Sequence, residues 1–136
     1  MDQPMMLGFA VLLMWGVWAF FTKLTAVHLS ARSGLVFSSI GGIIVLVGVL
    51  ISIGFRPDAE SHGVIFALIA GLIASLASIM FLLALRSGKA SIIVTMTALY
   101  PIITIILSYV FLQERITLVQ GAGIMLSLVA LVLFSI

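Results

Sequence analysis

Charge is what this sequence has least of. Only 7% of its 136 residues are charged, while 64% are hydrophobic. A soluble domain carries about 25% charged and about 45–50% apolar residues. A small soluble domain could not bury so much apolar side chain, because small domains leave a large share of their surface exposed. The chain is therefore predicted to be an integral membrane protein surrounded by lipid, with a single domain over residues 1–136.

Cysteine is absent altogether, which excludes disulfides, thiolate metal sites and cysteine nucleophiles. The charges sum to +2 and are scattered, so they do not form the clustered basic face of a nucleic-acid-binding protein. His28 and His62 each stand alone near a predicted helix end. Serine, histidine and aspartate do not gather into a catalytic group. We therefore expect no enzyme, no metal site, no cofactor and no nucleic-acid partner.

Long apolar runs are what the sequence has in abundance, separated by four short polar segments. A helix needs about 20 apolar residues to cross about 30 Å of hydrocarbon. Each run meets this length, and the short connections make neighbouring helices antiparallel. The predicted fold is an all-α integral membrane protein, a bundle of five transmembrane helices with short loops. The expected helices cover residues 4–26, 33–55, 63–85, 90–112 and 116–136.

The basic residues predict how the chain inserts. Five crossings place the termini on opposite sides of the membrane. The amino-terminal side carries Arg56 and Arg115, and the opposite side carries Lys23, Arg32, Arg86 and Lys89. Because basic loops are retained in the cytoplasm, we predict an external amino terminus and a cytoplasmic carboxyl terminus in the plasma or inner membrane. The difference is small, so insertion in both orientations stays open.

The first helix carries two features that could belong to a solute pathway. Lys23 is the one ionisable residue within an apolar run. Its ammonium could snorkel to the headgroups, or it could attract a solute at the mouth of a cavity. Trp15 and Trp18 are three residues apart and so share a helix face. They could pack against another helix, or they could form an aromatic wall along a pathway, continued by Phe21 or Thr22.

The fourth run combines a proline with a polar stripe. Pro101 falls in mid-helix, where it removes a backbone donor and predicts a kink. The polar residues of the stripe follow at spacings of three, four and four: Thr97, Tyr100, Thr104 and Ser108. Their hydroxyls could bond back to their own helix. A stripe beside a kink also fits a pathway, because irregular backbone at membrane depth is tolerated where it lines a wet cavity.

Small residues on the other helices predict close helix packing, because they let backbones approach each other. These residues are Ser38 and Gly42 in the second run, Gly71, Ser75 and Ser78 in the third, and Gly123 and Ser127 in the fifth. Such patterns are common in membrane helices. Packing within the chain is therefore the default interpretation, ahead of dimerisation.

Two segments of the chain carry a characteristic pattern. The first reads LLMWGVWAFFTKL, and the second reads ALRSGKASIIVTMTALYPIITIILSYVFLQERITLVQGAGIMLSLVALVL. Both resemble the EamA domains of the drug/metabolite transporter superfamily. The likeness covers essentially the whole chain. Members of that family typically have ten helices, arranged as two five-helix repeats of inverted topology. This chain resembles one repeat, which implies a homodimer or a heterodimer with a related five-helix chain.

The resemblance implies a small-solute transporter working by alternating access, with amino acids, other metabolites or drug-like cations as candidate substrates. The lipid bilayer and the solute are then its main partners. Trp15, Trp18, Lys23, Thr97, Tyr100, Thr104 and Ser108 would line the pathway, and Pro101 would supply the kink. The alternative is a membrane subunit that transports nothing and stabilises another membrane protein.

Overall fold

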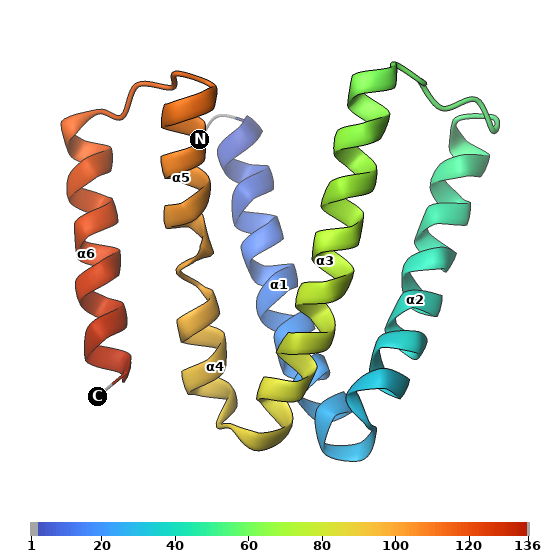
Figure 1. The fold of residues 1–136 in the computed structure, drawn as a ribbon, viewed down its shortest axis with the longest axis horizontal. Helices are drawn as coiled ribbons and strands as arrows, with labels where there is room; N and C mark the ends of the chain where they lie inside the picture. Colours follow the sequence, from blue (N-terminus) through green and yellow to red (C-terminus); the bar gives the residue numbers. More distant parts are fainter. Residues whose placement is uncertain (1–2, 136) are drawn as a thin grey trace. The chain divides into compact units, whose positions relative to one another are not determined.

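The computed structural model describes residues 3–135, and within that range it contains helices and connecting turns but no strand. The chain divides into two compact units, one up to Ser87 and one from Gly88 onward. Unit 1 contains α1 (Gln3–His28), α2 (Ala31–Ser52) and α3 (Ser61–Ser87) (Figure 1). Unit 2 contains α4 (Ala90–Thr97), α5 (Tyr100–Phe111) and α6 (Leu118–Ser135).

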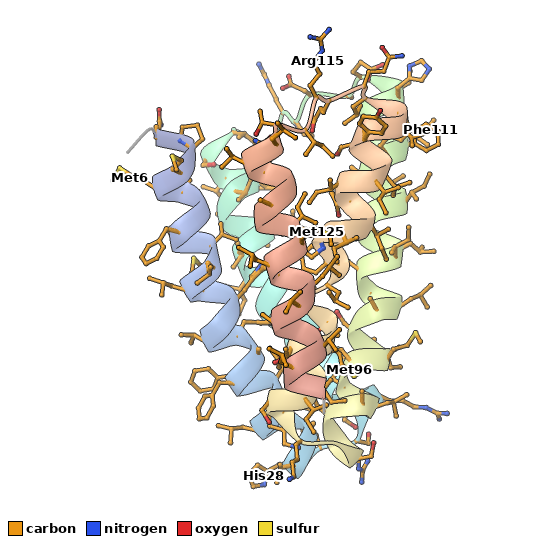
Figure 2. The ribbon with its side chains drawn as sticks, turned by 90° about the vertical axis from the view of Figure 1, so that its left-hand side faces the viewer. Met6, His28, Met96, Phe111, Arg115 and Met125 are labelled. Carbon is orange, nitrogen blue, oxygen red and sulfur yellow. The ribbon has the colours of Figure 1, made fainter. Side chains whose placement is uncertain are left out.

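Four helical segments are long and apolar enough to cross a membrane. Three are α1, α2 and α3, and the fourth is Ala90–Phe111, which joins α4 and α5. Their side chains project outward as a lipid-facing surface requires, and Figure 2 shows Met6 and Phe111 pointing away from their own helices. These two side chains are 61% and 76% exposed. The expected all-helical membrane architecture is confirmed for these four segments.

The fifth expected crossing, residues 116–136, is shorter in the structure. The helix begins at Leu118 rather than at residue 116, and residue 136 lies outside the described range. The stretch Leu118–Ala130 is a shorter apolar helix than the other four spans, so the described residues do not establish a fifth crossing. Thr117 and Gln120 explain the later start. Gln120 Oε1 accepts from the Thr117 N–H at 2.9 Å and Thr117 Oγ1 accepts from the Gln120 N–H at 3.2 Å, a reciprocal helix cap.

The second expected helix, residues 33–55, also has different ends. It begins early because Ser30 caps it, with Ser30 Oγ accepting from the Ser33 N–H at 3.2 Å. It ends early because Gly54 and Phe55 both have positive φ, 61° and 57°. A residue in this left-handed region terminates a helix, and the Phe55 N–H then bonds to the Leu50 carbonyl at 2.9 Å. The helix therefore stops at Ser52.

The three helices of unit 1 meet at one end. The carboxyl ends of α1 and α3 lie beside the amino end of α2, so α1 and α3 run parallel and α2 runs against both (Figure 1). Four of the buried side chains of this unit, Ala26, Ala31, Leu82 and Leu85, gather here, and Leu85 is 0% exposed. We call these four residues, with their surroundings, the convergent end. Packing in unit 1 is concentrated there.

Gly34 lies where all three helices of unit 1 approach one another at the convergent end. A Cβ atom added to Gly34 would lie 3.0 Å from Thr25 Cγ2 of α1 and 3.4 Å from both Cδ atoms of Leu82 in α3. A small residue is therefore required where the three helices come together, since membrane helices associate through close van der Waals contact. Sequence reasoning did not single out Gly34.

Unit 2 has a broken helix in place of the single helix expected over residues 90–112. The helix is interrupted at Ala98 and Leu99, immediately before α5 begins. The Leu99 N–H bonds to the Met96 carbonyl at 3.3 Å, three residues back rather than four. Pro101 lies in the first turn of α5, where its missing N–H costs nothing. Within this unit α6 packs against α4.

Candidate functional site in a pocket between three helices

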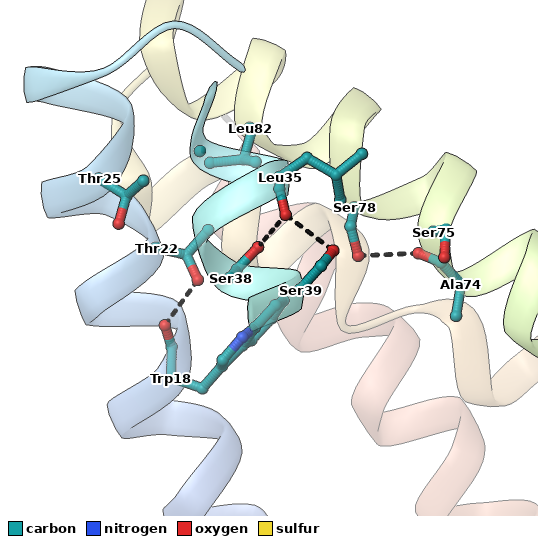
Figure 3. A pocket seen from close by; sticks show the side chains of 11 residues that line it. Trp18, Thr22, Thr25, Leu35, Ser38, Ser39, Ala74, Ser75, Ser78 and Leu82 are labelled. Atoms are coloured by element: carbon teal, nitrogen blue, oxygen red, sulfur yellow. Dashed lines mark hydrogen bonds between the residues drawn. The ribbon is translucent and has the colours of Figure 1, made fainter. Parts of the chain in front are cut away.

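A pocket of about 230 Å³ lies among the three helices of unit 1. Its lining residues are Trp18, Thr22 and Thr25 of α1, Gly34, Leu35, Ser38 and Ser39 of α2, and Ala74, Ser75, Ser78 and Leu82 of α3 (Figure 3). Six of them carry hydroxyl groups, so we call this space the hydroxyl pocket. None of the eleven described lining residues is charged.

Each of the six hydroxyls donates its proton to a carbonyl of its own helix. The donor–acceptor distances lie between 2.8 and 3.0 Å, and examples are Thr22 to the Trp18 carbonyl and Ser78 to the Ala74 carbonyl (Figure 3). A hydroxyl has one proton to donate and two lone pairs to accept with. The protons are engaged inside the helices, so the oxygens offer the pocket acceptor capacity.

Trp18 supplies the aromatic wall of the hydroxyl pocket. Its ring stacks on Phe81 of α3, with centroids 5.6 Å apart and planes at 10°. Trp18 as a whole residue is still 47% exposed. Trp15, which sequence reasoning placed on the same face, does not line this pocket. The structure therefore gives the two tryptophans different surroundings.

The hydroxyl pocket extends from the middle of α1 and α3 toward the convergent end. Ser75 is near the middle of α3, and Trp18 is close to the middle of α1. Gly34 and Leu82 bound the pocket on the side of the convergent end. A polar hollow in the middle of apolar helices is unusual, because polar groups in a membrane interior normally mark a pathway or a helix contact.

Lys23 has a defined partner near the convergent end. Its Nζ donates to the carbonyl of Leu85 at 2.5 Å, and the residue is partly buried. Leu85 belongs to the last turn of α3, where carbonyls lack helical partners and a positive charge is favoured by the helix dipole. Lys23 lines neither of the two pockets described here. The structure thus shows a helix-end contact, which sequence reasoning had not considered.

Unit 2 contains a second pocket, of about 610 Å³, between α5, α6 and the loop that joins them. It includes two members of the predicted polar stripe, Thr104 and Ser108, together with Glu114 and Arg115 of the loop. Thr97 and Tyr100 line neither pocket. The Thr97 hydroxyl donates to the carbonyl of Val94 at 2.9 Å within its own helix. Half of the predicted stripe therefore lines the pocket of unit 2, and the other half lines neither pocket.

Comparison with known proteins places the chain in a family. The sequence profile of the EamA-like transporter family matches residues 3–136. The chain belongs to the EamA-like transporter family. An uncharacterized protein of Methanocaldococcus jannaschii is 32% identical over 136 residues, covering 100% of this chain and 98% of that protein. No solved structure matches. As an EamA-like protein with four apolar spans, the chain is an integral, multi-pass membrane protein.

The small residues that predicted helix packing have mixed surroundings in this EamA-like chain. Ser38, Ser75 and Ser78 line the hydroxyl pocket, and Gly123 and Ser127 line the pocket of unit 2. Beyond its own helix, no atom lies within 4 Å of a Cβ position at Gly42, Gly71 or Gly123. No neighbouring helix of the described chain approaches these glycines, so their role in packing stays a prediction.

Sequence reasoning gave little weight to half of the pocket's hydroxyls. Thr22 was considered only as an extension of the aromatic wall, and Thr25 and Ser39 were not considered. A signal was available, because Thr22 and Ser38 are equally far in sequence from Ser30, which lies between α1 and α2. Antiparallel neighbours joined by a tight turn bring such positions to the same depth. No group of His, Asp and Glu able to hold a metal ion occurs among the described residues.

Proposed function

We propose that this chain is a small-solute carrier that works by alternating access, with the hydroxyl pocket as a solute-binding site. The observation that carries the proposal is the convergence of six hydroxyls and Trp18 on one hollow at membrane depth. Ligand sites in proteins combine a concave surface with a few polar groups that orient the ligand. The chain's place in a transporter family supports the same reading.

The convergent end supports alternating access. Ala26, Ala31 and Leu85 are buried there, and Gly34 and Leu82 bound the pocket on that side. A carrier must close its site on one side while it opens on the other. The structure would then represent one of the two states, and the second state would require the contact around Gly34 to loosen.

We propose further that the working unit is a dimer of five-helix chains, with α6 as the fifth crossing. The archaeal relative is covered over 98% of its length, so it too is matched as one repeat. Trp15, Lys23, Thr97, Tyr100, Thr104 and Ser108 remain candidate pathway residues in this assembly, and Pro101 remains the candidate kink. Whether the partner is parallel or antiparallel depends on how the chain inserts.

Insertion can be measured cleanly, because the natural chain has no cysteine. Single cysteines placed in the turn after α2 and in the turn between α3 and α4 would be labelled from outside the cell with a membrane-impermeant maleimide. Labelling only in the turn after α2 supports an external amino terminus. Labelling of both sites indicates dual insertion and permits an antiparallel homodimer.

Transport is tested with the purified chain in liposomes and a panel of radiolabelled amino acids, amines and other metabolites. Ser75→Leu, which fills the hydroxyl pocket, should abolish uptake of any transported solute. Ser87→Leu is the matched control, because Ser87 is on the same helix but does not line the pocket. Tyr100→Ala tests the broken helix in the same assay.

The absence of flux for the whole panel, together with stable co-purification with another membrane protein, would instead support a non-transporting subunit. Equal loss of uptake in Ser75→Leu and Ser87→Leu would remove the hydroxyl pocket from the pathway.

A further inference from the structure

The hydrogen-bond pattern of the hydroxyl pocket points to its ligand. We propose that it binds a small primary ammonium cation, and that it selects this group because the pocket offers acceptors and almost no donors. The proposal rests on the carrier function above, and it adds the chemical class of the solute.

The first step is the count of donors and acceptors. All six hydroxyl protons are held by carbonyls of the helices to which they belong. The donor that remains among the lining side chains is the indole N–H of Trp18. An ammonium group has three donors and no acceptor. Each N–H of an ammonium ion can therefore find an acceptor in this pocket, whereas a carboxylate or phosphate would find too few donors.

The second step is charge. No described lining residue carries a positive charge, and the ammonium of Lys23 is bound to the Leu85 carbonyl outside the pocket. An anion would lose its hydration without a counter-charge, which is costly at membrane depth. A cation has two sources of compensation here. Hydroxyl oxygens present their negative ends, and the Trp18 ring, which lines the pocket, can attract a cation through its π electrons.

The third step is size. Ligand pockets for drug-sized molecules usually have volumes of about 300–1,000 Å³. At about 230 Å³ the hydroxyl pocket is smaller. A short alkylammonium ion fits this space, with its ammonium against the serines of α2 and α3 and its alkyl chain against Leu35 or Leu82.

Binding to the full chain in detergent is the test, with Trp18 as the reporter. In a Trp15→Phe background Trp18 is the only indole, since the chain has two tryptophans. The probes are butylammonium, tetramethylammonium and butyrate at neutral pH and constant ionic strength. We expect a saturable change in Trp18 fluorescence with butylammonium, weaker binding of tetramethylammonium, which has no N–H, and no response to butyrate.

Serine-to-alanine variants test whether the hydroxyl oxygens are the acceptors. Ser75→Ala with Ser78→Ala should weaken butylammonium binding about tenfold or more, because hydrogen bonds to a charged group are worth about 1.5–3 kcal/mol each. Ser87→Ala, outside the pocket on the same helix, should bind as the parent does. Alanine is the best helix former, so the helix is retained. Ser38→Ala with Ser39→Ala, controlled by Ser52→Ala, repeats the test on α2.

Three results would overturn the proposal: tighter binding of butyrate, equal or tighter binding of tetramethylammonium, or unchanged binding in both serine pairs. No response to any probe would also overturn it. These outcomes are separable from failure of the carrier function. Butylammonium binding without flux leaves the pocket chemistry standing, whereas Ser75-dependent flux of another solute without butylammonium binding leaves the carrier standing.

Discussion

Units 1 and 2 of this chain differ in the length of their helices and in the burial of their side chains. Unit 1 has three unbroken helices of 22 to 27 residues and contains every side chain that is buried in the described structure. Unit 2 has helices of 8, 12 and 18 residues, and none of its described side chains is buried. Its pocket includes charged residues of a loop, whereas the hydroxyl pocket is neutral.

This difference predicts that the two units move in different ways. Lipid is as apolar as a leucine side chain, so helices in a membrane are held together by close van der Waals packing and by hydrogen bonds. Unit 1 has both, at Gly34 and at Lys23. Unit 2 has a helix interruption and no buried side chain among its described residues. We therefore expect the helices of unit 1 to stay unbroken and to move only at the contact around Gly34, and unit 2 to change its backbone at Ala98 and Leu99.

The largest effect is expected from Pro101→Ala, which should make unit 2 more like unit 1. A proline inside a helix costs about 3 kcal/mol. Removing it should shift the balance toward a straight helix by about a hundredfold. We expect at least a tenfold loss of solute flux in liposomes, without loss of folded protein.

Pro4→Ala is the matched control for Pro101→Ala. Pro4 lies in the first turn of α1, where no N–H is needed. Unchanged flux in Pro101→Ala would mean that the interruption at Ala98 and Leu99 is not used in transport. The proposed contrast between a unit of unbroken helices and a unit whose backbone changes would then be lost.

The second prediction concerns packing in unit 1. Gly34→Leu should lower the free energy of unfolding by about 1–3 kcal/mol, because it overpacks the contact with Thr25 and Leu82. Gly48→Leu, on the same helix with no neighbour within 4 Å, should change it little. Thermal unfolding in detergent measures both. Equal stability of the two variants would show that the convergent end does not hold unit 1 together.

The third prediction concerns the charge at the convergent end. Lys23→Met should lower the free energy of unfolding by about 1 kcal/mol, since it removes a charged donor from the Leu85 carbonyl at the end of α3. Lys23→Arg, which keeps the charge, should recover part of the loss. If Lys23→Met and Lys23→Arg unfold at the same temperature, the positive charge is not what stabilises this end.

The smallest effect is expected at the other end of α3. The pKa of Glu60 is lowered from its ordinary value of 4.5 by hydrogen bonds from the N–H groups of Gly63 and His62, and by the His62 side chain. A lowered pKa means that Glu60 stabilises the fold at pH values above 4.5. That contribution is lost as the pH falls below 4.5 and passes through the lowered pKa.

Glu60→Gln should therefore make thermal unfolding less dependent on pH below 4.5. Asp58→Asn controls for the loss of one negative charge in the same loop. A pH profile for Glu60→Gln identical to that of the natural chain would show that the hydrogen bonds to Glu60 do not contribute to stability.

Much of the fold was predictable because lipid makes a simple demand on sequence. Each crossing needs a continuous apolar run, and the first four runs became four apolar spans. Helix ends were less predictable. The second helix ends early because Gly54 and Phe55 adopt left-handed conformations. The sequence did not predict this helix end, because the residues there are apolar. Pro101 predicted a kink in the fourth expected helix. The sequence did not predict the two-residue interruption, because this depends on backbone hydrogen bonds around Met96.

The candidate site was harder to predict, for a physical reason. A stripe such as Thr97 to Ser108 repeats within one helix and is visible in sequence. The hydroxyl pocket is formed by three helices, so predicting it requires knowing which residues of the three helices lie at the same depth. The contact of Lys23 was also hidden, because its partner is the backbone carbonyl of Leu85 and every residue has a carbonyl. Trp18 was identified, although its stacking partner Phe81 was not.

The hydrogen bonds that hold the six hydroxyl protons have a consequence for the affinity of the pocket. Because each O–H group already donates to a backbone carbonyl, a bound solute does not have to restrict its rotation. The lining is pre-organised, so little conformational entropy is lost when a solute binds. Such a site would bind its proposed solute more tightly than the same hydroxyls would if they were free to rotate, which favours uptake at low solute concentration.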